Sequence, residues 1–191
     1  MKIDRSVIVS FILLVVIASL YRVMPTREWG FAPQIAMALF AGAVIKDRKL
    51  SFLLPLLSMF ISDVIYEILF INHMTPISGF YSGQALNYAL FAVITVIGFF
   101  VKKENVVSIL GGALAGTTLY FILSNFGVWI GGGLDLMNQP YPKTLEGLTR
   151  CFVGAVPFYK MSLLSTIFFS GVFFGGYYLI NRFWISKTVT A

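Results

Sequence analysis

Two carboxylates, Asp63 and Glu67, interrupt one of the apolar runs of this chain. Their four-residue spacing places both side chains on one face of a helix, and Tyr66 lies on that face three residues after Asp63. In a lipid bilayer each charge must be paired, hydrogen-bonded or hydrated, because an isolated charge costs about 3 kcal/mol or more. At 1.5 Å per residue, Asp63 lies ~12 Å and Glu67 ~6 Å from the end of the run at Ile71. These residues are therefore the first candidates for a site.

Lys160 is a candidate ionic partner for the two carboxylates. It lies where the last apolar run begins, and that run descends from the side on which the Asp63 run ends. An ion pair between Lys160 and Asp63 or Glu67 would neutralise one buried carboxylate. Alternatively, Lys160 extends its flexible side chain to the aqueous interface, as lysines near helix ends do. Both interpretations are open at this point.

Amide and aromatic side chains lie near the same side in two further runs. Gln84 and Asn87 begin one run, and Asn125 and Trp129 end another. An amide in hydrocarbon needs a hydrogen-bond partner, so Asn125 should face other helices or a cavity. These side chains either line an outward-facing polar cavity or make ordinary hydrogen bonds between helices. The candidate ligand-binding residues are Asp63, Tyr66, Glu67, Gln84, Asn87, Asn125, Trp129 and Lys160.

Signatures of known enzyme classes are absent from the sequence. The single histidine, His73, lies in no HExxH motif, and the single cysteine, Cys151, excludes an intramolecular disulfide and a CxxC metal site. There is no GxSxG motif, and the glycines at 131–133 are not followed by the Lys-Ser/Thr pair of a phosphate-binding loop. We therefore expect no catalytic residue, no metal and no cofactor.

The composition indicates an integral membrane protein. Of the 191 residues, 58% are hydrophobic and 12% are charged, and the mean hydropathy is +0.86. A soluble domain of this size has too little interior to bury so much apolar surface. Continuous apolar runs favour helices, which satisfy their own backbone hydrogen bonds in lipid. The net charge of +6 comes from residues between the runs, so it indicates topology rather than a nucleic-acid partner.

Six apolar runs predict an all-α bundle of six transmembrane helices. The first run follows Lys2 and Arg5 as in a signal peptide, but no A-x-A cleavage site follows it, so we expect a retained span. No internal repeat is visible, which favours one domain over residues 1–191. The predicted spans are residues 6–23, 31–45, 50–71, 84–101, 106–130 and 158–181.

The distribution of Lys and Arg predicts that both termini are cytoplasmic. Six spans place both termini on one side, and the basic residues are concentrated there. The lipid bilayer is then the first partner of the chain, and the turn at Trp29, the loop around His73 and the stretch from Ser124 to Lys160 are external. The basic residues assigned to the cytoplasmic side are Lys2, Arg5, Lys46, Arg48, Lys49, Lys102, Lys103, Arg182 and Lys187, against Arg22, Arg27, Lys143 and Arg150 outside.

A short interfacial helix is predicted before the last span. Leu145, Leu148, Phe152 and Ala155 follow one another at three- and four-residue spacing and form one apolar stripe. Thr144 can cap the start of this helix, and a proline at position 157 would separate it from the span. The alternative is that the same residues form the outer turns of the last span.

Several short motifs of this sequence resemble those of a family of uncharacterised bacterial membrane proteins described as transport proteins. That family in turn resembles the membrane-embedded substrate-binding (S) components of energy-coupling factor (ECF) transporters. The resemblance extends over most of the chain, from Phe31 to Gly175. The motifs that carry it are FAPQIAMALFAGA, LLPLLSMFISD, SNFGVWI, YPKTLEGL and PFYK.

The resemblance implies six helices in a bacterial cytoplasmic (inner) membrane, cytoplasmic termini and a site covered by external loops. Those loops contain Trp29, Tyr81 and Trp129 in this chain. It also implies a vitamin-like or metal ligand and an ECF-type energising module as partner. S components often carry two alanines at four-residue spacing in the first span, where they dock on the coupling subunit. This chain departs from that pattern, because its first span contains Ala18 alone.

Three functions remain as hypotheses. The first is a transport component, not an enzyme, that captures a small, vitamin-like molecule in an external-facing cavity. The second is an intramembrane enzyme that uses Asp63 and Glu67 as acid and base, which requires that their pKa values differ. The third is a non-catalytic scaffold subunit with small-residue helix faces as partner surfaces. A co-purifying metabolite favours the first hypothesis, and turnover of a lipid that depends on both carboxylates favours the second.

Overall fold

The computed structural model of the chain describes residues 5–24, 26, 28–135 and 137–182. This part of the chain is all-helical and contains six helices. The first five helices agree with the predicted runs to within three residues at each end. The basic residues Lys2, Arg27 and Lys187, which entered the topology prediction, lie outside the described residues. The helices are α1 (Arg5–Val23), α2 (Gln34–Val44), α3 (Arg48–Ile71), α4 (Gln84–Gly98), α5 (Val106–Ile130) and α6 (Leu145–Ile180).

Short polar side chains begin three of the helices. Asp47 accepts hydrogen bonds from the Lys49 N–H at 2.9 Å and the Leu50 N–H at 3.2 Å, which caps α3. Asn105 caps α5 by accepting from the Ser108 N–H at 2.9 Å. Thr144 caps α6, as its position before the apolar stripe predicts. Each cap satisfies a backbone donor that has no partner within the helix.

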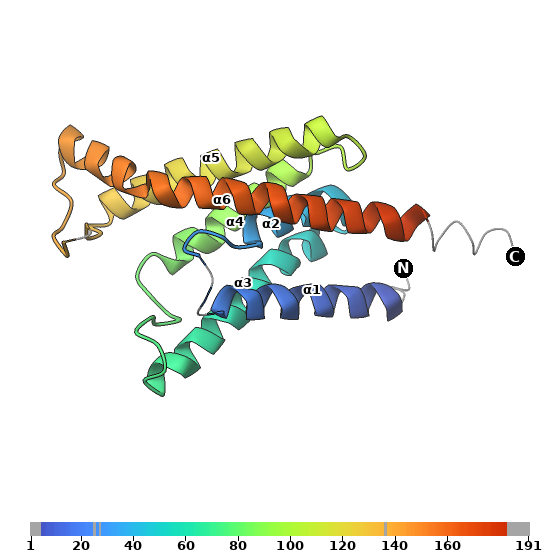
Figure 1. Cartoon of the computed structure of the whole chain (residues 1–191), viewed down its shortest axis with the longest axis horizontal. Coiled ribbons are helices and arrows are strands. Elements are labelled where there is room, and N and C mark those ends of the chain that lie inside the picture. The colour runs from blue at the N-terminus through green and yellow to red at the C-terminus, as the bar shows by residue number, and fades with distance from the viewer. Residues whose placement is uncertain (1–4, 25, 27, 136, 183–191) are drawn as a thin grey trace, which may run out of the picture.

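Consecutive helices alternate in direction, so their connections lie at two ends of the bundle (Figure 1). α1 begins and α6 ends at one end, where the α4–α5 connection also lies. Residues 72–83, which connect α3 to α4, and residues 131–135 and 137–144, between α5 and α6, lie at the other end, called the loop end below. The candidate residues of the sequence analysis lie in the halves of the helices nearest the loop end.

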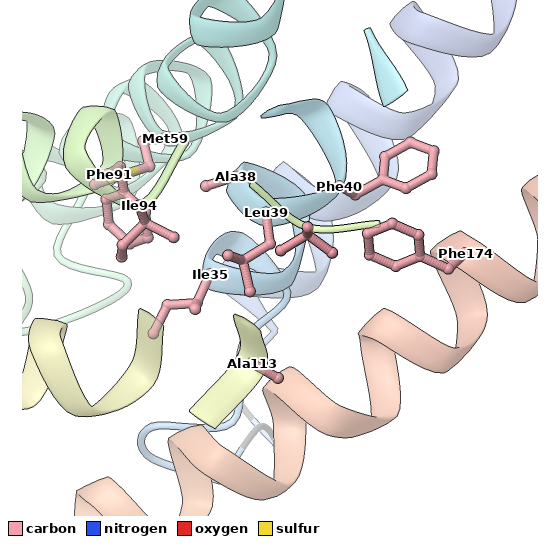
Figure 2. Close-up of a cluster of buried hydrophobic side chains, with 10 residues drawn as sticks. Ile35, Ala38, Leu39, Phe40, Met59, Phe91, Ile94, Ala113 and Phe174 are labelled. Atoms are coloured by element: carbon pink, nitrogen blue, oxygen red, sulfur yellow. The ribbon is translucent and has the colours of Figure 1, made fainter. Parts of the chain in front are cut away.

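α2 is the central element of the bundle. Every residue from Gln34 to Gly42 is buried, and the helix packs against α3, α4, α5 and α6. Figure 2 shows its apolar side chains surrounded by side chains from those four helices. This position explains why the run that forms α2 consists of apolar and small residues with one amide. The residues in this cluster include Ile35, Ala38 and Leu39 of α2, Met59 of α3, Phe91 and Ile94 of α4, Ala113 of α5 and Phe174 of α6.

Two glycines bring α2 and α4 into close contact. A Cβ atom added to Gly42 would lie 2.9 Å from the Cα of Gly98, and one added to Gly98 would lie 3.0 Å from the Cα of Gly42. Any side chain at either position would push the two backbones apart. In a bilayer the hydrophobic effect does not favour contact between helices over contact with lipid. Apolar helices therefore often pack through small residues, which let their backbones approach closely.

Three helices are long and apolar enough to cross a membrane: α3, α5 and α6. The other apolar helices of the described chain are shorter, and α2 has only 11 residues. An α-helix of 11 residues is ~17 Å long, about half the thickness of a bilayer core. α2 nevertheless lies inside the bundle, in contact with four helices that are all longer than it.

The predicted interfacial helix is wrong as a separate element. The residues from Leu145 onward form the first turns of α6, which continues through Pro157 to Ile180. A proline removes one helix hydrogen bond, but packing against a neighbouring helix can preserve the helical path. Here the outer part of α6 packs along α5, where the rings of Phe121 and Phe152 lie 5.5 Å apart. The structure therefore has the alternative arrangement, an extended last helix.

Candidate functional site

The carboxylate of Asp63 is the centre of a hydrogen-bond network at the loop end of the bundle. Its residue is only 1% exposed, on the face of α3 that contacts α1 and α4. One carboxylate oxygen accepts hydrogen bonds from Gln84 Nε2 at 2.7 Å and from the Tyr88 hydroxyl at 2.8 Å. Both donors come from the first turns of α4. The other oxygen forms an ion pair with Arg22, at the end of α1.

Arg22 connects α1 to α3 at this site. Besides Asp63, its guanidinium donates to the hydroxyl of Ser62 and to the Met59 carbonyl. The Arg22 backbone carbonyl accepts a hydrogen bond from the Tyr66 hydroxyl at 2.9 Å, and the guanidinium lies 5.7 Å from the centre of the Tyr66 ring. Ionisation of Asp63 is therefore compensated by a cation and two neutral donors. This arrangement meets the requirement for a buried charge.

A second, neutral group of side chains lies beside the ion pair. Asn87 on α4 donates to the Tyr81 hydroxyl and accepts from the Tyr120 hydroxyl at 2.9 Å. Tyr120 belongs to α5, and its ring packs on Phe91 at 5.4 Å. Asn87 thus connects the loop before α4 to the inner surface of α5. For Asn87 these contacts correspond to the second alternative of the sequence analysis, hydrogen bonds between helices, and Asn87 is not among the residues that line the cavity described below.

Glu67 has a different role from Asp63. Its Oε2 accepts hydrogen bonds from the Ser78 hydroxyl and the Gly79 N–H, both at 3.0 Å, and from the Phe80 N–H at 3.2 Å. These donors belong to the loop between α3 and α4. Gly79 is buried, and a Cβ atom there would collide with the Asp63 carbonyl and lie 2.6 Å from the Glu67 backbone nitrogen. Glu67 therefore fixes this loop against α3.

A cavity of about 730 Å³ lies between the end of α1, the outer half of α3 and the loop that Glu67 fixes. Arg22 and Asp63 supply the charged part of its lining, and three aromatic side chains face it. Trp29, one of these, is 67% exposed, so the cavity is accessible from the surface. The lining residues are Arg22, Val23, Met24, Trp29, Asp63, Tyr66, Leu69, Met74, Thr75, Ile77, Ser78 and Tyr81.

The lining favours binding of a small organic molecule. Ligand cavities are typically 300–1,000 Å³ and mostly apolar, with a few polar groups that orient the ligand. Aromatic and methionine side chains adapt to flat or irregular apolar surfaces. The described residues contain no group of three or more His, Cys, Asp or Glu side chains that could hold a metal ion.

The remaining candidates from the sequence lie apart from Asp63. Asn125 donates to the Phe121 carbonyl of its own helix at 2.7 Å, and Trp129 Nε1 donates to the Pro142 carbonyl at 2.8 Å. Lys143 donates to the Trp129 carbonyl and lies over its ring. These contacts stabilise the α5–α6 hairpin, which we define as residues 121–156, rather than the cavity.

The proposed pairing of Lys160 with Asp63 or Glu67 is wrong, since Asp63 pairs with Arg22 and the donors to Glu67 are Ser78, Gly79 and Phe80. Lys160 is exposed on α6. The sequence analysis counted Arg22 only among the basic residues of the external side, at the end of the first predicted span. Its position near the end of the first span was the signal that could have identified it. A cation at the outer end of one span can pair with a carboxylate in the outer half of another.

Two further site residues were absent from the candidate set. Tyr88 follows Gln84 by four residues and therefore shares its helix face, so the α4 side of the site was identifiable from spacing. Tyr81 was expected only as a residue of a covering loop, and it does line the cavity. Trp29 was expected in the same way and also lines it, whereas Trp129 does not belong to this lining.

Comparisons with known proteins give one family. Residues 2–188 match the model of a family of unknown function, DUF6580. No curated protein and no solved structure matches the chain.

Proposed function

The chain belongs to this family of unknown function, DUF6580, and from that premise we propose that it is a membrane transport component that captures a small molecule in the cavity beside Asp63. The observation that carries the proposal is the cavity itself. It opens at the loop end, has an aromatic and apolar lining, and contains one ion pair whose charges are already compensated. A preformed cavity of this kind supports capture of a vitamin-sized molecule.

The proposed topology is six membrane spans with both termini in the cytoplasm of a bacterium and the cavity facing outward. Three observations support it: the alternation of six helices, three helices of membrane-spanning length, and the excess of basic residues at the opposite end from the cavity. The shorter helices would cross as parts of the bundle. This arrangement resembles that of the S components of ECF transporters, whose ligands bind under external loops.

The contacts of Asp63 favour binding over acid–base catalysis. Both of its carboxylate oxygens accept hydrogen bonds from other helices, one from Arg22 and the other from Gln84 and Tyr88. A general acid or base must exchange its proton with a substrate, so it needs an oxygen that a substrate can reach. For an energy-dependent uptake the protein would act with a separate energising module, since its sequence contains no phosphate-binding loop.

Native mass spectrometry of the detergent-purified protein tests the proposal. We expect a bound small molecule in the wild type and its loss in Trp29→Ala, because Trp29 lines the cavity and is largely exposed. The matched control is Trp129→Phe, a tryptophan of the α5–α6 hairpin that lies outside the cavity lining. This control should retain the molecule.

Two results would contradict the proposal. The first is a ligand-free protein in repeated preparations together with unchanged uptake of vitamins in a deletion strain. The second is a bound molecule that is retained in Trp29→Ala and lost in the control. A ligand that turns over in the wild type but not in Asp63→Asn would instead favour the enzymatic alternative.

A further inference from the structure

Two helix connections carry a concentration of basic side chains at the end of the bundle opposite the loop end. We call this end the basic end; there residues 45–47 lead from α2 to α3, and residues 99–105 lead from α4 to α5. The charges occur as the run KDRK at the first connection and as KKE in the second. The basic surface is defined as Lys46, Arg48, Lys49, Lys102 and Lys103, and the carboxylates beside them are Asp47 and Glu104.

Aromatic rings join these segments into one surface. The guanidinium of Arg48, on α3, lies 3.8 Å from the centre of the Phe99 ring in the α4–α5 connection. Phe52 of α3 also packs on Phe99, with ring centres 5.6 Å apart. In the same connection, Lys103 Nζ donates to the hydroxyl of Tyr177 on α6 at 3.0 Å. The cations of separate segments are therefore held together at one face of the bundle.

The charges of the basic surface are not compensated within the described part of the chain. No ion pair there joins its cations to Asp47 or Glu104. The Asp47 carboxylate instead accepts from two backbone N–H groups at the start of α3. At the loop end, by contrast, Arg22 and Arg150 each pair with a carboxylate. An excess of one sign of charge attracts a partner of the opposite sign, so the basic surface favours an anion.

Exposed apolar side chains lie next to the Lys102–Lys103 pair in the chain. Phe100 is 79% exposed, and Val106 and Val107 in the first turn of α5 are 69% and 79% exposed. Lysines beside apolar surface are typical of the boundary between lipid chains and headgroups, where the charged end of the side chain extends to the polar side. The partner should therefore have an apolar part as well as a negative charge.

We propose that the basic surface binds anionic phospholipid of the bilayer leaflet at this end. The phosphate oxygens of the headgroup accept from its lysine and arginine side chains, and the acyl chains cover Phe100 and Val107. Anionic lipids attract basic segments at the membrane surface, by about fivefold in affinity for each Lys or Arg. The inference goes beyond the proposed capture of a small molecule and depends only on the membrane placement of the bundle.

Native mass spectrometry of the full-length, detergent-purified protein tests the inference with two lipids. The probes are phosphatidylglycerol and phosphatidylcholine with the same acyl chains, so they differ in the net charge of the headgroup. We expect the wild type to bind phosphatidylglycerol at least about fivefold more tightly than phosphatidylcholine. This preference should decrease as the salt concentration rises, because salt screens exposed charges.

Variants at the two connections show whether both contribute to one surface. Lys49→Gln and Lys102→Gln change exposed side chains, so each should fold and weaken phosphatidylglycerol binding about fivefold, and the double variant about 25-fold. Lys102→Arg keeps the charge and should retain the affinity. The matched control is Lys160→Gln, which removes the same charge from an exposed position of α6 outside the basic surface and should leave the affinity unchanged.

Four results would overturn the inference. Equal affinity for the two lipids, or an equal loss in Lys160→Gln and Lys102→Gln, would show that no specific surface binds anionic lipid. Inorganic phosphate that competes as well as phosphatidylglycerol would assign the surface to a soluble anion. A co-purified acidic protein that is lost in the double variant, with lipid binding unchanged, would assign it to a protein partner. Each result leaves the proposed function standing, since the cavity lies at the loop end.

Discussion

The loop end of the bundle contains two polar regions that are built in different ways. In the Asp63 network, which we define as Arg22, Asp63, Gln84 and Tyr88, hydrogen bonds join residues of three helices. In the α5–α6 hairpin, polar groups bond to nearby backbone, as Trp129 does to Pro142. Both regions contain an ion pair and aromatic side chains. Only the Asp63 network, whose hydrogen bonds join different helices, places polar side chains in the lining of the cavity.

Burial separates the two regions further. The side chain of Asp63 is 1% exposed and that of its partner Arg22 is 18% exposed, whereas Arg150, the partner of Asp135 in the hairpin, is 51% exposed. Removing one member of a buried ion pair leaves an uncompensated charge, while an exposed pair contributes little. The comparison shows two roles for these carboxylates. Asp63, whose partners come from other helices, belongs to the candidate site, whereas Asp135, whose partners are near it in the sequence, stabilises its own loop.

Asp63→Asn should produce the largest effect. It leaves the Arg22 guanidinium without its counterion, and breaking a buried pair costs about 3–5 kcal/mol. The unfolding free energy in an SDS titration should fall by about this amount, and cavity binding should be lost. Asp135→Asn, which breaks the pair of the α5–α6 hairpin, is the control and should change the unfolding free energy much less. Similar losses for both variants would erase the distinction between the two regions.

Gly79→Ala should have the next largest effect, because a Cβ atom there meets the backbone of α3. The loop would have to move away from Glu67, which opens one wall of the cavity. Overpacking of this kind costs about 1–3 kcal/mol, measured as the unfolding free energy. Gly171→Ala is the control, since a Cβ atom at Gly171 meets nothing within 4 Å and alanine favours a helix. Unchanged stability and ligand binding in Gly79→Ala would show that the loop does not form the wall.

Trp129→Phe should have a smaller and local effect. The substitution removes the hydrogen bond to the Pro142 carbonyl and retains an aromatic ring, so the unfolding free energy should fall by about 1 kcal/mol. Hydrogen exchange should become faster in residues 137–144, while the affinity of the cavity for its ligand stays the same. A loss of affinity in this variant would place the hairpin in the binding site after all.

The smallest effect concerns pH and the hairpin loop. Hydrogen bonds from the backbone of Gln139 and Met137, with the nearby Arg150 guanidinium, lower the pKa of the Asp135 carboxyl. A lowered pKa in the folded state means that the ionised group stabilises the loop above the ordinary value near 4 and ceases to do so as the pH falls through the lowered pKa. Hydrogen exchange in residues 137–141 should therefore show, after correction for the intrinsic rate, less protection at pH 3 than at pH 6. Asp135→Asn should abolish this difference.

Much of the fold was predictable because apolar runs in this chain are long and clearly bounded. The ends of the first five helices follow from the positions where polar residues begin, as at Asp47 and Asn105, which cap helices. The last helix was predicted too short. Pro157 favours a break in the helix because it has no backbone N–H to donate. Packing of the preceding turns of α6 on α5 nevertheless preserves the helix.

The candidate site was predictable in part. Asp63 and Gln84 were identified because polar residues in apolar runs need partners, and the structure joins them directly. The choice of partner was not predictable: Lys160 and Arg22 were both near the correct end of the molecule. Sequence spacing gives the face and depth of a residue on its own helix, but not which helices are neighbours. Asn125 and Trp129 were misplaced for the same reason.

The sequence by itself determined that this is an all-helical chain with membrane-spanning runs, and that its chemistry lies near one end. Those properties depend on hydrophobicity, periodicity and caps, which act within single segments. Only the tertiary structure decided that α2 is central, that Arg22 compensates Asp63, and that a cavity lies between the end of α1, the outer half of α3 and the loop before α4. These depend on contacts between segments distant in the chain, where many pairings satisfy the same local rules and packing of the whole bundle selects one.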